Sequence, residues 1–263
     1  MSPKTLHRRW SRRLELLQSR IERLYKGCRA AGDVESIHDL RVSIRRARLY
    51  AHVGRPLLRK GTVRQFDKWG RLINRWLGPI RDCDVCLNWL ASHAHSLEII
   101  QVVHEERARL WRLASQALHG KQYVKPVELR FHKQNKDHAE KLRERFDGLS
   151  RKVADRVIVG AAQAGAMNAS ELHRLRRHLR RWRYLRELSL SQRAQRTDVG
   201  LARLNKVQDA LGESQNLQTT VQLLSELLGQ AQQTKWIRRA HGDQLMWAAK
   251  IRRLLKRLPM EMV

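Results

Sequence analysis

The sequence is poor in cysteine and has no long apolar run. Its three cysteines, at positions 28, 83 and 86, are too few for the disulfide framework of a small secreted protein, which favours a reducing compartment. The first residues, Met1 to Lys4, lack the apolar core of a signal peptide. The longest weakly polar run covers residues 157–167, far short of the ~20 residues that a membrane span needs. We therefore expect a cytoplasmic protein with no membrane span.

Acidic residues are also scarce. The chain has 25 Asp and Glu against 54 Lys and Arg, which gives a formal net charge of +29. Residues 1–125 contribute +15 and residues 126–263 contribute +14, so the charge is not confined to a tail. Hydrophobic residues make up 42% of the chain, enough for a folded core. A folded body this basic is expected to bind polyanions such as nucleic acid, an anionic membrane or polyphosphate.

No stretch alternates apolar and polar residues as a β-strand does, whereas apolar residues recur at helical spacing. We therefore expect an all-α fold of duplicated antiparallel helical bundles, related by a pseudo-two-fold. All five prolines fall at expected helix boundaries, so Gly78-Pro79 should end one helix and Asp82 should cap the next. The expected helices cover residues 4–29, 34–53, 62–77, 96–118, 132–159, 170–190, 199–211, 216–230 and 234–257, with a short one after Asp82. Residues 119–131 read as a linker, which predicts one domain over 4–257 with repeats at 4–118 and 127–257.

Two parallel patterns lie on the second expected helix. Apolar residues at Ile37, Leu40 and Ile44 form a seam that a helix would bury. A shift of one position along a helix is a rotation of about 100°, so residues that follow the seam by one position border the core. In this helix those residues are basic: His38, Arg41, Arg45, Arg48 and His52. We interpret this row as an anion-binding surface that lacks acidic partners, the alternative being an ordinary solvated helix face.

The same construction returns later in the chain. Leu172, Leu175 and Leu179 form a second seam, and a second basic row follows it by one position: His173, Arg176, Arg180 and Arg183. A Leu-Gly phrase follows each row, at Gly78 and at Gly212. His38 and His173 are 135 positions apart and the two glycines 134, which predicts an internal duplication.

These motifs resemble the CHAD (conserved histidine α-helical domain) family. The residues that carry the resemblance are H-x-x-R-x-x-x-R-R-x-R from His38, L-G-x-x-R-D from Leu77, and L-H-x-L-R-x-x-x-R-R-x-R-Y from Leu172. The resemblance covers residues 4 to 257 and implies a duplicated helical bundle whose basic surface binds inorganic polyphosphate. One departure is Gln215-Asn216, which stands where the first copy has Arg81-Asp82.

The resemblance and the basic rows together suggest non-catalytic polyphosphate binding, with polyphosphate granules as a possible location. A third basic row, on the helix expected at 62–77, runs beside Trp69 and Leu72. The candidate polyphosphate-binding residues are His38, Arg41, Arg45, Arg48, Lys68, Arg71, Arg75, His173, Arg176, Arg180 and Arg183. For the two histidines, a structural role remains an equal alternative.

Other chemistries have less support in the sequence. A nucleic-acid-binding protein would share the charge, but no recognition motif is present. His38-Asp39 could belong to a metal-dependent phosphohydrolase, although further ligands for a cation are missing. Cys83 and Cys86 lack a second pair for a zinc site, and a helix cap with a local ion pair explains Arg81-Asp82. We therefore expect no enzymatic activity, no cofactor and no metal.

Overall fold

The structure, a computed structural model, describes residues 1–93, 97–119, 125–132, 137–164 and 167–256. Within these residues it contains nine α-helices and no β-strand, which confirms the all-α expectation. The helices are α1 (Pro3–Ala31), α2 (Val34–Val53), α3 (Thr62–His93), α4 (Leu97–His119), α5 (His138–Gln163), α6 (Ala169–Ser189), α7 (Gln192–Thr197), α8 (Val199–Leu227) and α9 (Gln230–Lys256). A 3-10 turn covers Arg55–Leu57. None of the described helices is long and apolar enough to cross a bilayer.

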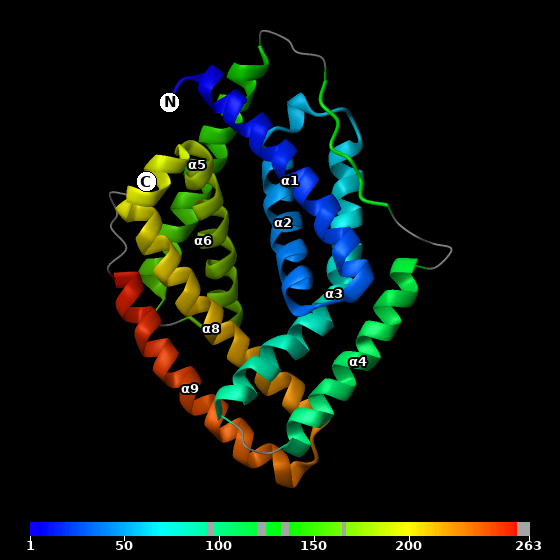
Figure 1. Ribbon diagram of the computed structural model, residues 1–263. Coiled ribbons are helices and arrows are strands. Elements are labelled where there is room, and N and C mark those ends of the chain that lie inside the picture. Colours follow the sequence, from blue (N-terminus) through cyan, green and yellow to red (C-terminus); the bar gives the residue numbers. More distant parts are fainter. Residues whose placement is uncertain (94–96, 120–124, 133–136, 165–166, 257–263) are drawn as a thin grey trace.

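The two helices that carry the signature motifs begin at well-formed caps. The Asp33 carboxylate accepts a hydrogen bond from the Ser36 amide at the start of α2, as the sequence predicts. At the start of α6, Asn168 and Glu171 form a reciprocal capping box. Each of these helices follows a long antiparallel partner, since α1 packs on α2 and α5 packs on α6 (Figure 1).

Both halves of the chain contribute to one main hydrophobic core. The predicted seam residues are buried there except Leu172, which is partly buried, and Leu40, Ile44 and Leu179 are completely inaccessible to solvent. Trp10 of α1 lies in the same core and donates a hydrogen bond from its indole nitrogen to the Tyr50 carbonyl oxygen, at 2.8 Å. The predicted division into two bundles related by a pseudo-two-fold stays a prediction, because this core is continuous across the halves.

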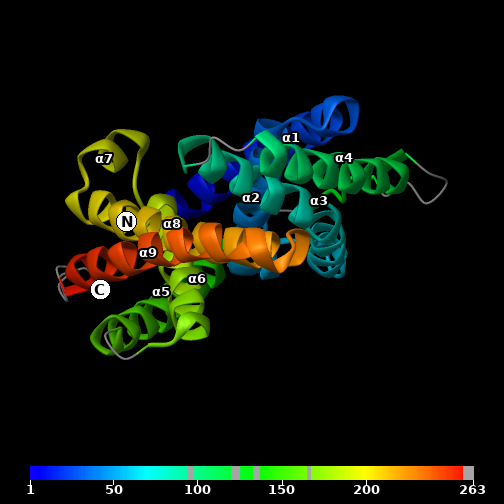
Figure 2. The same ribbon diagram turned by 90° about the horizontal axis from the view of Figure 1, so that it is seen from below.

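A second, smaller core lies where the C-terminal parts of α3 and α8 meet α4 and α9 (Figures 1 and 2). Cys83, Cys86 and Leu90 of α3 pack there against Leu224 of α8. Burial raises the pKa of both thiols to about 12, so they stay protonated at neutral pH. The two cysteines are packing residues, in agreement with the interpretation from their apolar neighbours.

Several predictions of helix boundaries are wrong, and the helix expected from residue 132 begins at His138. Helix α3 continues through Gly78 and Pro79, so Asp82 lies inside it and caps nothing. Proline removes one backbone hydrogen bond, but Leu77 and Ile80 on either side are fully buried and hold the helix together. Figure 1 shows that α3 changes direction along its course, as expected for a helix that contains proline. The expected helices at 199–211 and 216–230 are one continuous helix, α8, and the short α7 was not expected.

We predict opposite effects on stability for two glycine substitutions. A Cβ at Gly54, which ends α2, would lie 1.8 Å from the buried indole ring of Trp10. Gly54→Ala should therefore lower the free energy of unfolding by about 1–3 kcal/mol, the usual cost of overpacking. Gly148 of α5 has open space around it, so Gly148→Ala should stabilise the protein by about 0.5–1 kcal/mol. Denaturant unfolding followed by circular dichroism measures both, and equal stabilisation by the two variants would show that the Trp10 contact is wrong.

Candidate functional site

The two basic rows predicted from the sequence come close to each other at Arg45 of α2, whose charge acts on arginines of the row on α6. These helices contact each other, lie side by side and run in the same direction (Figure 1). Their rows therefore run in parallel. The arginines of both rows are half-buried, because each row borders a buried seam: Arg41, Arg45 and Arg48 on α2, and Arg176, Arg180 and Arg183 on α6.

Arg45 connects the two rows electrostatically. Arg45 of α2 interacts electrostatically with Arg183 of α6. Among charged residues, it has the largest effect on the pKa of both Arg176 and Arg180. Burial, and then repulsion by Arg45, lowers the pKa of Arg180 to about 9. Burial, and then repulsion by Arg45, lowers the pKa of Arg41 to about 10. The charged form of these two side chains is thus less stable in the free protein than it is in water, and a bound anion would stabilise that charged form.

Two of the six arginines have carboxylate partners. Arg48 is paired with Asp67 of α3 at 2.7 Å, and Arg183 is paired with Glu187 at 3.5 Å. The expectation that the rows lack acidic partners is therefore wrong at these positions. The other four make no ion pair within the described part of the chain, and we call them the central arginines: Arg41, Arg45, Arg176 and Arg180.

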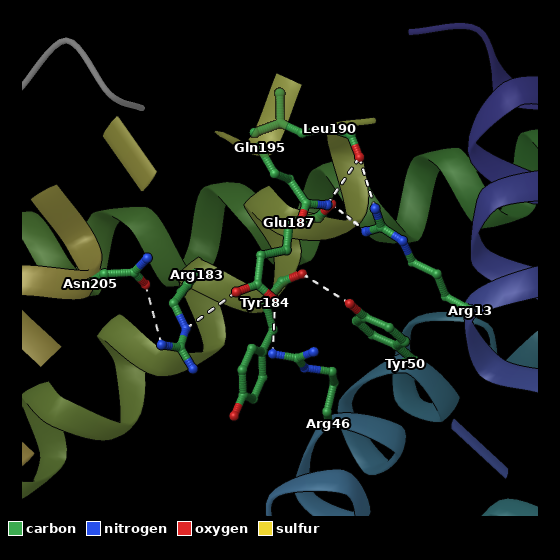
Figure 3. Close-up of polar contacts among 9 residues, drawn as sticks. All are labelled: Arg13, Arg46, Tyr50, Arg183, Tyr184, Glu187, Leu190, Gln195 and Asn205. Carbon is green, nitrogen blue, oxygen red and sulfur yellow. Dashed lines mark hydrogen bonds and ion pairs between the residues drawn. The ribbon is translucent and has the colours of Figure 1, made fainter. Parts of the chain in front are cut away.

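Glu187 and Tyr184 build one end of the site (Figure 3). The Glu187 carboxylate also contacts Arg46 of α2, at 3.1 Å, so it bridges the two helices. The Tyr184 ring lies against the guanidinium groups of Arg46 and Arg183, at 4.6 and 5.1 Å from its centroid. The candidate binding residues did not include Arg46, Tyr184 or Glu187. Arg46 and Tyr184 belong to the motifs that begin at His38 and Leu172, and the i,i+4 spacing of Arg183 and Glu187 is a signal for an ion pair.

The repeated Leu-Gly phrases lie directly against the rows. A Cβ built on Gly78 would be 3.1 Å from Nη1 of Arg41, and one on Gly212 would be 3.7 Å from Nη2 of Arg176. The same Nη1 of Arg41 donates a hydrogen bond to the Asn74 carbonyl oxygen, at 3.2 Å. Gly78 thus leaves room for the guanidinium group of Arg41, whereas a Cβ at Gly212 would make only an ordinary van der Waals contact with Arg176.

The two histidines are both exposed but differ in their surroundings. The pKa of His38 is lowered, first by the protein packed around its ring and then by the charge of Arg81. His173 is hydrogen-bonded through Nδ1 to Oε1 of Gln215, at 2.6 Å. Gln215, half of the sequence departure in the second copy, therefore holds the second histidine by a neutral contact.

The third predicted row lies apart from these contacts. Lys68, Arg71 and Arg75 are exposed on α3. Among the described residues, no hydrogen bond or ion pair connects them to the rows on α2 and α6.

Asp82 lies within α3 near Arg41 and Arg81. Burial raises its pKa, while the two arginines act in the opposite direction. Over the ranges that the structure describes, no group of three or more His, Cys, Asp and Glu side chains could hold a metal ion. The arrangement is thus one of cationic donors on two neighbouring helices, suited to binding an extended anion.

Comparison with known proteins gives a family and a fold. No curated protein sequence matches the chain. Among solved structures, the CHAD domain from the plant Ricinus communis is similar with a TM-score of 0.68 and 21% identity, over 94% of this chain and 90% of that one. PptA from Streptomyces chartreusis is similar with a TM-score of 0.60 and 16% identity, over 93% and 95% of the two chains. At these identities the similarity establishes a shared fold.

The family comparison is more specific than the structural one. The CHAD domain model matches residues 12–225, which include both basic rows and both Leu-Gly phrases. The match extends over most of the sequence, and it confirms the resemblance that the motifs indicate. The chain belongs to the CHAD domain family.

Proposed function

We propose that this protein binds inorganic polyphosphate between α2 and α6, without catalysing a reaction. The observation that carries the proposal is the cluster of central arginines, Arg41, Arg45, Arg176 and Arg180, half-buried and without ion pairs among the described residues. Guanidinium groups donate pairs of hydrogen bonds to phosphate oxygens, and a row of them suits a chain with a charge on every unit.

The Glu187 contacts support this mode of binding. Its carboxylate already lies between an arginine of α2 and an arginine of α6, so the spacing of the two helices allows one oxyanion to be held from both sides. The central arginines lie along the same helices and make no ion pair with a carboxylate among the described residues. In the proposed complex, phosphate groups occupy positions between the rows, and His38 and His173 contact the polymer from the N-terminal ends of both rows.

Nucleic acid is the main alternative ligand, and one observation disfavours it. Single-stranded nucleic acid is usually held by exposed aromatic rings on which the bases stack. Here Trp10, Trp69 and Trp182 are buried, as their seam positions predict. Polyphosphate has no bases and needs only the cationic donors that the two rows provide.

We predict that polyphosphate competes best for the site. With a fluorescent polyphosphate probe at physiological salt, unlabelled polyphosphate should displace the probe at lower phosphate concentration than RNA or duplex DNA, because the buried Trp10, Trp69 and Trp182 offer bases nothing to stack on. Incubation with or without divalent metal should release no phosphate from the polymer. Stronger displacement by RNA would favour the nucleic-acid alternative, and metal-dependent phosphate release would contradict the non-catalytic proposal.

We also predict that a central arginine weakens the fold while it strengthens binding. Arg180→Gln should raise the free energy of unfolding of the free protein by about 0.5–2 kcal/mol, since it removes a charge that burial and Arg45 disfavour. The same variant should bind polyphosphate at least about tenfold more weakly, as expected for the loss of a charge-assisted contact. Thermal unfolding and probe titration measure the two effects.

Arg203→Gln, a change at an exposed position of α8, is the control and should alter neither stability nor binding. If Arg180→Gln binds polyphosphate normally, the second row does not belong to the site.

A third prediction concerns pH. Because the pKa of free His38 is lowered and a bound polyanion must raise it, binding should take up a proton at this residue. Affinity should then fall as pH rises from about 5.5 to 7.5 at fixed ionic strength, around the ordinary histidine pKa of about 6.5. His38→Gln should flatten this dependence, and His104→Gln, an exposed change on α4, should leave it intact. A wild-type affinity independent of pH over this range would show that His38 does not contact the polymer as a cation.

A further inference from the structure

Glu187 is held rigidly at the end of the site where α2 and α6 approach α1 and α7. Its carbonyl oxygen accepts hydrogen bonds from Arg13 of α1 and from Nε2 of Gln195, the latter at 2.8 Å (Figure 3). Arg13 also donates to the Leu190 carbonyl oxygen, at 2.9 Å. The side chain of Glu187 is only 14% exposed. The hydrogen bonds hold the backbone at Glu187, and the low exposure of the side chain keeps its carboxylate beside its partners.

The two partners of this carboxylate would otherwise extend the cationic surface. Arg46 and Arg183 have side chains 31% and 20% exposed, and both lie against the Tyr184 ring. Arg183 is further held by Asn205 of α8, at 3.2 Å. Without the Glu187 charge, these two guanidinium groups would continue the row of central arginines by one more step.

The two halves differ at this position. At the offset of 135 that relates His38 to His173, Glu187 corresponds to His52 of α2. His52 is exposed, and burial and then Arg145 lower its pKa. The carboxylate is thus a feature of the second half alone and is not required by the repeated pattern.

We propose that Glu187 is a residue that limits polyphosphate binding. Its carboxylate acts as a fixed internal counter-anion that occupies Arg46 and Arg183, and so ends the polymer path one step beyond the central arginines. This proposal rests on the proposed function, since it concerns the extent of the same site. Its chemical consequence is that a negative charge of the protein competes with phosphate for two arginines.

The test is Glu187→Gln, which keeps the shape and hydrogen-bonding capacity of the side chain but removes the charge. The variant should bind long-chain polyphosphate about five- to tenfold more tightly than wild type. The slope of the logarithm of the association constant against the logarithm of salt concentration should increase in magnitude by about one to two, because up to two more cations contact the polymer. Glu226→Gln changes the net charge equally at an exposed site on α8 and should alter neither quantity.

Arg183→Gln in both backgrounds completes the experiment. In the wild-type background it should weaken binding less than Arg180→Gln does, because Glu187 already occupies Arg183. In the Glu187→Gln background it should cancel at least half of the gain. Weaker or unchanged binding by Glu187→Gln overturns the proposal. The proposal is also overturned if Arg183→Gln alone reduces the affinity for polyphosphate as much as Arg180→Gln does. This comparison does not need Glu187→Gln, so it can be made even if that variant fails to fold. If wild-type protein does not bind polyphosphate at all, the proposed function itself has failed.

Discussion

Repulsion among half-buried arginines is the constraint on which this structure depends. The basic rows follow the apolar seams by one position, so burial of Leu40, Ile44 and Leu179 brings the arginines to the border of the core. Water screens charge poorly at such a border, and Arg45 faces cations of the opposite helix there. The packing that stabilises the fold therefore also concentrates charge of one sign between α2 and α6.

The fold tolerates this charge in three ways. A core shared by both halves holds α2 and α6 in place through α1 and α5. Carboxylates neutralise the outermost arginines, Asp67 at Arg48 and Glu187 at Arg183. The central arginines are left without such partners in the part of the chain that the structure describes. Asp82 and Glu213 act on Arg41 and Arg176 without forming ion pairs, so the region keeps an excess of positive charge that a bound anion would offset.

Much of this arrangement could be predicted from the sequence because it follows from helical geometry. The seam and the row beside it have the period of one helix, and the recurrence of both predicts that two such helices exist. The partner of Arg48 could not be predicted in the same way, because Asp67 is on another helix and only tertiary packing brings it near. Gly78-Pro79 misled the boundary prediction, since a local signal for helix termination was overridden by the burial of Leu77 and Ile80. The opposition of the two rows depends on how α2 packs against α6, which no local pattern contains.

The salt dependence of polyphosphate binding tests the central claim most directly. If the four central arginines contact phosphate groups together, the logarithm of the association constant should fall with the logarithm of salt concentration with a slope of magnitude about 3 or more. Arg45→Gln combined with Arg180→Gln should reduce that slope by about 1.5 to 2, with helical content unchanged. A slope near zero, or the same slope in wild type and the double variant, would contradict the account.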